Sequence, residues 1–235
     1  MRLPSCLVAV PQLLVVLVGV PGSGKSTFAQ HLLADAGTTD DDSRAWRRVS
    51  QDVLKTRKRC VASTRAALRA GEHVLIDRCN FDRVQRSHWL QAAADYETEL
   101  GLLARPTTGD EGAGNDGVAE STCAPLICLA VHLPIDMGEA KRRVLNRDAH
   151  EGGVDAFSMT DEKIEEIVAR MHGSMRPPQR REGFDEVLQV ATSSAGTTSS
   201  RGLMCREAAV RRIHAIAAGE GQVQGKTKGA FKGVV

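Results

Sequence analysis

Short apolar runs alternate along this chain with longer stretches in which apolar residues recur at helical spacing. Residues 13–18, 73–77, 126–133 and 187–190 are rich in Val, Leu and Ile. Short, nearly continuous apolar runs are typical of strands that are buried on both faces of a parallel sheet. Residues 46–52 predict a shorter strand, which ends in a polar corner.

Helical spacing fills most of the segments between these runs. The predicted helices cover residues 26–34, 53–70, 83–94, 135–146 and 160–171, and the second of them is strongly basic. Strands and helices in alternation indicate βαβ units. We therefore predict an α/β fold, a doubly wound and mostly parallel sheet with helices on both faces and a small lid.

Shifts in composition predict where the folded unit begins and ends. Residues 1–11 are predicted to be a leader and residues 12–190 the folded domain. Within that domain, residues 105–125 are rich in Gly, Thr, Asp and Glu, which predicts a flexible insertion. A plain surface loop is favoured there over a regulatory element. Residues 191–235 are predicted to be a linker, a short basic helix and a disordered tail.

Composition narrows the class of protein. The chain has 235 residues, of which 42% are hydrophobic and 3% aromatic, enough for one α/β domain with an aliphatic core. The net charge of +2 predicts no partner by itself, so binding to nucleic acid would need a local basic patch. The six cysteines form no CxxC pair and no zinc spacing, which indicates reduced thiols.

The apolar N-terminal stretch resembles a signal peptide at first sight. It leads directly into the first predicted strand, so its removal would remove that strand as well. Pro4 and Pro11 interrupt it, and it is too short to span a membrane. We expect a nuclear or cytoplasmic protein that is not secreted and has no membrane partner.

A glycine-rich stretch lies between the first predicted strand and the first predicted helix. Residues 19–27 fit G-x-x-x-x-G-K-[ST], the phosphate-binding loop (P-loop) of nucleotide enzymes, in the strand–loop–helix context that this motif requires. A ligand-free turn is the less favoured alternative. Lys25 would reach the β- and γ-phosphates of ATP, and Ser26 would bind Mg²⁺. The predicted ATP contacts are Gly19, Pro21, Gly22, Ser23, Gly24, Lys25, Ser26 and Thr27.

Two carboxylates follow predicted strands at the rim where this loop lies. Asp52 and Asp77 each come at the carboxyl end of a strand, where doubly wound sheets bind their ligands. Asp52 is a candidate general base for a substrate hydroxyl, and from the pattern alone a helix N-cap is equally favoured. Asp77 is a candidate Mg²⁺ ligand through water, with an N-cap or a turn acid as the equal alternative.

Three stretches together resemble one enzyme family. The sequences SQDVL at 50–54, KTRKRC at 55–60 and IDRCNFDR at 76–83 are similar to the kinase module of polynucleotide 5′-hydroxyl kinases. The last stretch is most similar to the kinase module that is fused to plant aprataxin-like proteins, because animal enzymes more often have Ile-Asp-Asn-Thr-Asn-Pro there. The resemblance covers about residues 12–190.

This resemblance implies roles for individual residues. It makes Asp52 the general base and favours that role over capping. It also places several side chains near the acceptor strand, and Arg57, at the start of the basic helix, joins them on charge. The predicted acceptor contacts are Asp52, Arg57, Arg78, Asn80, Arg83 and Arg86.

The segment after the strand at 126–133 is predicted to carry the lid. In kinases of this shape a lid brings arginines to the transferred phosphoryl group, because a guanidinium donates several N–H bonds to developing charge. Arg143 and Arg147 are the lid candidates. The alternative is a solvated basic helix end that the helix dipole favours.

Together these features predict ATP-dependent transfer of the γ-phosphate to the 5′-hydroxyl end of DNA or RNA, in nucleic-acid repair, with ATP and Mg²⁺. Few aromatic residues argue against base stacking, which suits recognition of a strand end and its phosphates. Two alternatives stay open. One is a P-loop kinase of a small-metabolite hydroxyl, and the other is a non-catalytic ATP-binding module that binds nucleic-acid ends.

Overall fold

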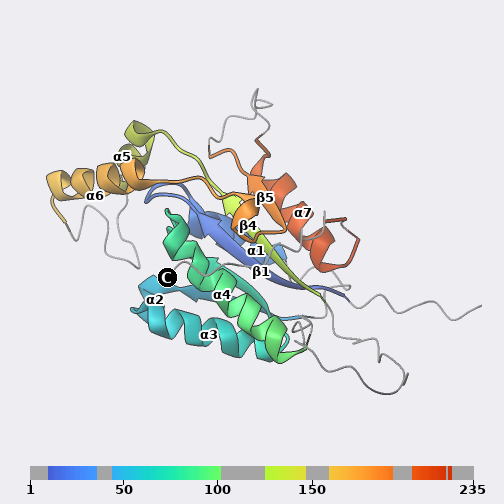
Figure 1. Ribbon diagram of the computed structural model, residues 1–235. Helices are drawn as coiled ribbons and strands as arrows, with labels where there is room; N and C mark the ends of the chain where they lie inside the picture. The colour runs from blue at the N-terminus through green and yellow to red at the C-terminus, as the bar shows by residue number, and fades with distance from the viewer. Residues whose placement is uncertain are drawn as a thin grey trace, which may run out of the picture.

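A five-stranded parallel sheet lies at the centre of the computed structural model (Figure 1). The structure describes residues 10–35, 44–101, 125–146, 159–192, 203–220 and 222–223. The strand order is β2-β3-β1-β4-β5, and each neighbouring pair is parallel. The strands are β1 (Gln12–Val18), β2 (Trp46–Ser50), β3 (His73–Asp77), β4 (Leu126–His132) and β5 (Glu186–Gln189). The predicted α/β fold with a doubly wound sheet is confirmed.

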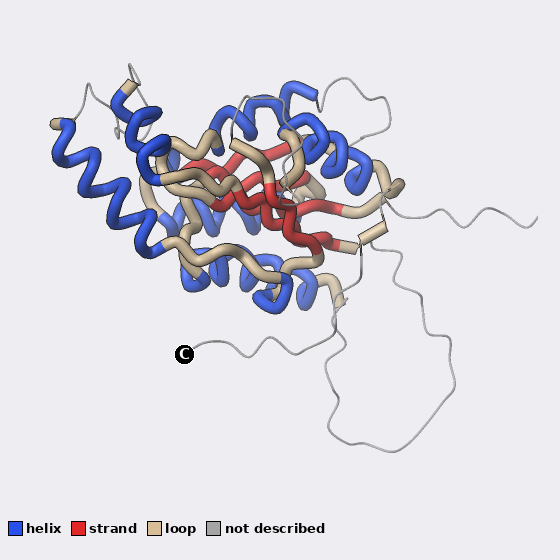
Figure 2. Tube along the Cα trace, turned by 90° about the horizontal axis from the view of Figure 1, so that it is seen from above, coloured by secondary structure: helices blue, strands red, loops and turns tan. Residues whose placement is uncertain are grey.

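Helices lie on both faces of the sheet, as Figure 2 shows from above. No helix within the described ranges has both the length and the apolar character needed to cross a bilayer. The helices are α1 (Lys25–Asp35), α2 (Gln51–Leu54), α3 (Arg57–Arg69), α4 (Arg83–Glu99), α5 (Met137–Leu145), α6 (Asp161–Ser174) and α7 (Arg206–Ala217), with a 3-10 turn, η1 (Arg180–Glu182).

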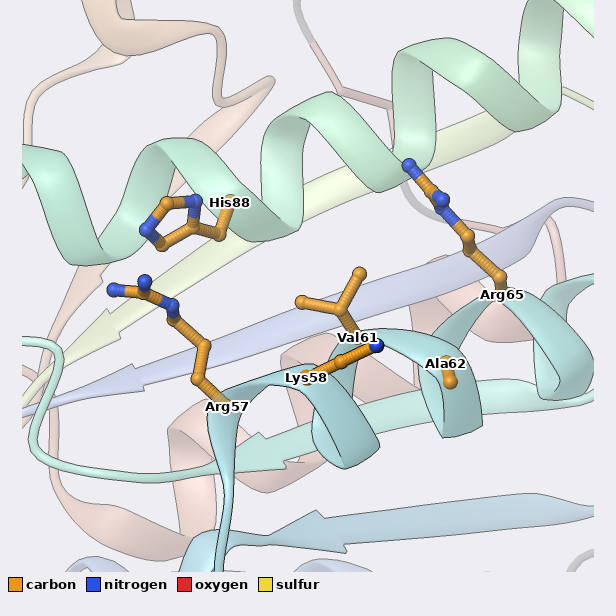
Figure 3. A pocket seen from close by; sticks show the side chains of 6 residues that line it. All are labelled: Arg57, Lys58, Val61, Ala62, Arg65 and His88. Atoms are coloured by element: carbon orange, nitrogen blue, oxygen red, sulfur yellow. The ribbon is translucent and has the colours of Figure 1, made fainter.

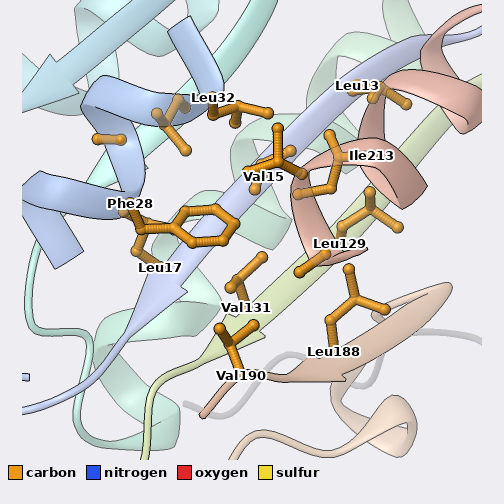
Figure 4. Packing of buried hydrophobic residues seen from close by; sticks show 14 of the residues in the cluster. Leu13, Val15, Leu17, Phe28, Leu32, Leu129, Val131, Leu188, Val190 and Ile213 are labelled. Atoms are coloured by element: carbon orange, nitrogen blue, oxygen red, sulfur yellow. The ribbon is translucent and has the colours of Figure 1, made fainter. Parts of the chain in front are cut away.

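Alternate residues of β1 face the two helical layers. Leu13, Val15 and Leu17 pack with residues of α1 and α7 (Figure 4), whereas Leu14 and Val16 pack with residues of α3 and α4. All five side chains are fully buried. Because helices cover both faces, β1 has no polar alternation, and this is why the strand is a continuous apolar run in the sequence.

Helix α7 belongs to the same core as the sheet, although composition predicted a linker, a short basic helix and a tail outside the folded domain. Val210, Ile213 and Ile216 are at most 2% exposed and pack in one cluster with strands β1, β4 and β5. Full burial of each such aliphatic side chain stabilises the fold by roughly 1.5–3 kcal/mol. The folded unit therefore includes α7. The predicted leader and insertion lie almost wholly outside the described residues.

Helices α5 and α6 pack against each other beyond the carboxyl edge of the sheet (Figure 1). Ala140 and Val144 of α5 and Ile164 and Val168 of α6 form a small apolar cluster that includes Val20, in the loop after β1. This pair of helices therefore lies against the predicted phosphate-binding loop. The connection between the two helices, residues 147–158, lies outside the described residues.

The carboxyl ends of the strands bring together segments that are far apart in the sequence. The backbone N–H of Gly19, after β1, donates to the Cys79 carbonyl, after β3, at 2.9 Å. In the ladder between β2 and β3, Ser50 is paired with Asp77, so Asp52 lies just beyond the edge next to Asp77. The predicted loop and both predicted carboxylates thus share one rim of the sheet.

Candidate active site

The loop between β1 and α1 has a backbone that only glycine can adopt at two positions. Gly22 and Gly24 have φ angles of +84° and +88°. A Cβ atom at Gly22 would lie 2.5 Å from the carbonyl oxygen of Ala140 in α5. Glycine at position 22 therefore lets the loop pack directly against α5, and the positive φ angles are typical of a loop whose backbone N–H groups cradle a phosphate. This cradle fits a phosphate group.

The ammonium of Lys25 is folded over the loop. Its Nζ donates to the Val20 carbonyl at 2.9 Å and to Ser23 Oγ at 3.5 Å, and the residue is 9% exposed. Both partners are neutral, so among the described residues no carboxylate is paired with this charge. A buried cation without an opposite charge suits the phosphates of a nucleotide.

Ser26 and Thr27 follow in the first turn of α1, where the helix N-terminus carries a partial positive charge. Among the described residues, no three His, Cys, Asp or Glu side chains gather as a metal site. A Mg²⁺ ion at a P-loop does not need such a cluster, because a hydroxyl, phosphate oxygens and waters complete its octahedral shell. The hydroxyl of Ser26 is therefore sufficient for the predicted Mg²⁺ to fit here.

Asp77 ends β3 and is paired with Arg48 of β2. Arg48 donates from Nε at 2.9 Å and from a terminal nitrogen at 2.7 Å, both to Oδ2, and Asp77 is 5% exposed. The N-cap of the following helix α4 is Asp82, so Asp77 is not a cap. Of the two interpretations of Asp77, the structure excludes capping and adds an ion pair that the sequence did not indicate.

Asp52 is the second residue of α2 and is half-buried. The N-cap of α2 is Ser50, so the capping alternative for Asp52 does not hold either. Within the described ranges its carboxylate makes no hydrogen bond or ion pair. Its charge acts on the Cys60 thiol in α3, whose pKa is raised first by burial and to a lesser extent by Asp52, and lowered by Arg78. Asp52 and Arg78 are therefore both close enough to Cys60 to act on it through their charges.

Arg57, Arg78 and His88 come together at the space between α3 and α4. Figure 3 shows the Arg57 side chain pointing toward His88 across a pocket of about 520 Å³. Burial lowers the pKa of His88, and the charges of Arg57 and Arg78 act in the same direction. Burial likewise lowers the pKa of Arg78, whose buried Nη1 has no hydrogen-bond partner among the described residues. No motif in the sequence indicated His88, because its place beside Arg57 depends on packing between two helices.

The basic residues of α3 fall into two groups. Those near its C-terminal end are ion-paired with acids of α4: Arg65 with Asp95, and Arg69 with Glu99. Those at its N-terminal end have no side-chain partner within the described ranges: Arg57, Lys58 and Arg59. Cations are unfavourable at a helix N-terminus, so helix stability does not explain the second group. They form an unpaired positive patch next to the rim that carries Asp52.

Two of the predicted acceptor contacts must be corrected, because they are interior. Arg86 is fully buried and its guanidinium is paired with Glu182, at 2.7 and 2.8 Å. Asn80 is also fully buried; it donates to the Leu17 carbonyl and accepts from the Trp89 indole N–H, both at 2.8 Å. Both side chains hold the rim together and do not face an acceptor. Arg83, by contrast, is exposed at the start of α4.

The structure describes only one of the two predicted lid arginines. Arg143 lies on α5, where it donates to Glu139 at 2.6 Å and to the Thr192 carbonyl at 2.7 Å. Hydrogen bonds from Arg142 and Arg143 lower the pKa of Glu139 to about 2. In this conformation the Arg143 guanidinium is therefore engaged within the protein. Arg147 lies outside the described residues.

Comparison with known proteins identifies a family and several relatives. The profile of the AAA domain family matches residues 14–178. The chain is 27% identical over 183 residues to the transcription factor bHLH140 of Arabidopsis thaliana, which takes in 75% of this chain and 16% of that protein. It is 37% identical over 89 residues to the bifunctional polynucleotide phosphatase/kinase of Schizosaccharomyces pombe, which takes in 38% of this chain and 20% of that protein.

A third relative is the putative bifunctional polynucleotide phosphatase/kinase of Acanthamoeba polyphaga mimivirus. It is 32% identical over 82 residues, which take in 35% of this chain and 18% of that protein. Two relatives with this name confirm the resemblance to polynucleotide kinases that the sequence indicated. The chain spans a fifth or less of the length of these three curated relatives.

Two solved structures have a similar fold. A fungal RNA kinase superposes with a TM-score of 0.57 and 14% identity, over 88% of this chain and 87% of that chain. Kti12 of Chaetomium thermophilum, in complex with ADP-AlF3, superposes with a TM-score of 0.53 and 15% identity, over 87% of this chain and 98% of that chain. At such identities the likeness shows the fold alone.

Proposed function

The chain belongs to the AAA domain family, and we propose that within it this protein transfers the γ-phosphate of ATP to the 5′-hydroxyl end of a nucleic-acid strand. The observation that carries the proposal is the state of Asp52. It is a carboxylate without a partner among the described residues, on the rim that also holds the phosphate-binding loop, beside a patch of unpaired cations. A non-catalytic binding module would not need a carboxylate without a hydrogen bond or ion pair at that place.

The loop supplies the donor side of this reaction. Lys25, the loop N–H groups and the N-terminus of α1 would hold the triphosphate, in place of the neutral partners that Lys25 now contacts. Ser26, with Asp77 acting through water, would hold Mg²⁺, which offsets negative charge on the β- and γ-phosphates. The Oδ2 atom of Asp77 is already fixed by Arg48, which orients the carboxylate.

Asp52 supplies the acceptor side. Its carboxylate would accept the proton of the 5′-hydroxyl as that oxygen attacks the γ-phosphorus and the bond to the β–γ bridging oxygen breaks, leaving ADP. Arg147, and Arg143 once its bonds to Glu139 and Thr192 break, would donate hydrogen bonds to the transferred phosphoryl group. Arg147 is proposed from its place in the sequence.

The acceptor strand would approach over the N-terminal end of α3. The unpaired side chains of Arg57 and Arg78, with the exposed Arg83, provide positive charge beside the rim. Contacts of this kind bind strand phosphates without reading sequence. A role in nucleic-acid repair, in the nucleus or the cytoplasm, is part of the proposal, and relatives named polynucleotide phosphatase/kinase support it.

The test is transfer of labelled phosphate from ATP to 5′-hydroxyl single-stranded DNA, duplex DNA and RNA at two salt concentrations, with sugars and nucleosides as competing acceptors. We expect a labelled 5′ end and a transfer rate that falls steeply with salt, because strand binding displaces counterions. Transfer to a sugar or nucleoside alone would identify a small-metabolite kinase. Binding of ATP and strand without transfer would identify a non-catalytic module.

A further inference from the structure

Helix α7 brings a guanidinium group to the phosphate-binding loop. Its first residue is Arg206, and a Cβ atom built at Gly24 would lie 3.8 Å from Arg206 Nη2. Gly24 directly precedes Lys25 in the loop. Arg206 lies beyond residues 14–178, which the family profile matches, so neither the motif nor the family profile assigns it a role.

The position of Arg206 is fixed by the core. Ala209, Val210 and Ile213 of α7 pack in the same buried cluster as Phe28 and Leu32 of α1, the helix that follows the loop. Figure 1 shows α7 beside α1, and the two helices are in contact. The guanidinium is therefore carried to the loop by a rigid element of the fold and not by a free tail.

Within the described part of the chain, the guanidinium of Arg206 acts on the carboxylate of the adjacent, exposed Glu207 only through its charge, without a direct ion pair. The Arg206 side chain makes no hydrogen bond or ion pair there, and its Nε atom is buried without a partner. A buried N–H group that lacks an acceptor is unfavourable, and a cation in the first turn of a helix opposes the helix dipole. Arg212, on the same helix, shows how a partly buried arginine is usually accommodated, because it is ion-paired with Glu186 at 3.0 Å.

From this arrangement we infer that Arg206 is a nucleotide-binding residue that donates hydrogen bonds to the phosphate chain of bound ATP. The inference rests on the nucleotide site of the proposed function and adds to it a contact from the C-terminal helix. Phosphate oxygens are the acceptors that a fork of guanidinium N–H groups suits best, and the loop that cradles them lies directly beneath this side chain.

The test is the affinity of the whole chain for Mg²⁺·ATP, measured by calorimetry without any acceptor, and for tripolyphosphate, measured by displacement of a fluorescent ATP analogue. Arg206→Ala is expected to weaken both affinities by roughly tenfold or more, since a charged hydrogen bond is lost. Arg206→Lys should recover part of the loss, because it keeps the charge. The matched control Arg211→Ala, an exposed arginine of the same helix, should change both affinities by less than about twofold.

The outcomes separate this inference from the proposed function. Equal affinity of Arg206→Ala and the wild type, at equal melting temperature, would overturn the inference. A loss of ATP affinity with unchanged tripolyphosphate affinity would also overturn it, because the contact would then be to the base or the ribose. Wild-type protein that binds ATP but phosphorylates no strand would refute the proposed function alone, and wild-type protein that binds no ATP would refute both.

Discussion

Arg48 on β2 gives both of its hydrogen bonds with Asp77 to one carboxylate oxygen, Oδ2, at 2.9 and 2.7 Å. The pair joins the ends of two parallel strands at the rim that also carries the loop of residues 19–27. Arg48 therefore has two effects on Asp77: it compensates a nearly buried charge, and it leaves the second oxygen uninvolved in their pairing. Each effect can be measured separately.

Replacing Arg48 by Gln should destabilise the protein, because it leaves the Asp77 carboxylate buried without its cation. We expect the free energy of unfolding in urea to fall by about 3 kcal/mol, and the double variant with Asp77→Asn to recover much of that loss. Arg47→Gln is the matched control, since its pair with Glu72 is exposed and its loss should lower the free energy of unfolding much less. Equal losses for Arg48→Gln and Arg47→Gln would show that the buried pair contributes no more to the free energy of unfolding than the exposed pair.

Asp77→Asn should raise the Mg²⁺ concentration that ATP binding requires, because an amide is a weaker partner for a metal-bound water than a carboxylate. The measurement is ATP affinity by calorimetry over a Mg²⁺ titration, with the stability of the variant checked in parallel. A Mg²⁺ dependence identical to that of the wild type would leave Asp77 with only its structural pairing to Arg48.

Asp52→Asn should abolish most of the activity and leave the fold intact. Loss of a general base lowers kcat by roughly 10²–10⁴-fold. ATP affinity and melting temperature should stay the same, since the described residues give this carboxylate no bond to lose. Glu162→Gln, an exposed acid of α6, is the charge-matched control. Full activity of Asp52→Asn on a 5′-hydroxyl oligonucleotide would remove the base assignment.

Arg57→Ala and Arg78→Ala should weaken binding of the acceptor strand, and Arg69→Ala should not. All three remove one positive charge, but Arg69 is already ion-paired with Glu99 at 2.7 Å. For each of the first two variants, the slope of log affinity against log salt should become shallower by about one phosphate contact. The measurement is fluorescence anisotropy with a labelled oligonucleotide. Equal effects of all three variants would indicate that strand affinity depends on the net charge of the protein and not on a defined path of the strand over its surface.

His132 should make the fold sensitive to acid. Burial, with a smaller effect of the Arg86 charge, lowers the pKa of His132 to about 4, and within the described ranges its buried Nδ1 has no hydrogen-bond partner. In the unfolded chain the group titrates near its usual 6.5, so between about pH 6.5 and 4 the unfolded state binds the extra proton. Stability is thus fully present above pH 6.5 and falls toward pH 4, by up to about 3 kcal/mol from this group.

Urea unfolding at several pH values checks this expectation. The variant His132→Gln removes the titrating group, so the difference in unfolding free energy between wild type and variant should change across pH 4–6.5 and be flat above it. His31→Gln, in α1, is the control for histidine replacement in general. A constant difference between wild type and His132→Gln over the whole range would contradict the buried, neutral state.

The sequence correctly predicted those features of the fold that depend on residues close together in the chain. The run at 13–18 became β1 because both of its faces are covered, and residues 19–27 became a phosphate cradle because Gly22 and Gly24 can adopt positive φ angles. The strand predicted over residues 46–52 ends at Ser50, and Asp52 lies in the short helix α2 directly after it. In these cases the pattern and the fold agree within a few residues.

What the sequence could not predict depends on partners far away in the chain. Arg86 was predicted to contact the acceptor strand. Its ion-pair partner Glu182 is 96 residues away in the sequence, so this buried pair can be recognised only in the folded structure. The division of α3 into paired and unpaired cations depends in the same way on acids of α4, 30 residues on. Helix α7 was separated from the domain by a polar stretch, because composition does not reveal where a helix docks.

The Arg86 side chain also has a mechanical consequence. In addition to the pair that Nε and Nη2 form with Glu182, the Nη1 atom donates to the Arg176 carbonyl at 2.9 Å, just after α6. The Arg176 N–H donates in turn to the Phe81 carbonyl at 2.8 Å. The chain that leaves α6 is thus anchored to the loop after β3 and to helix α4, so any displacement of the C-terminal end of α6 would have to break these hydrogen bonds.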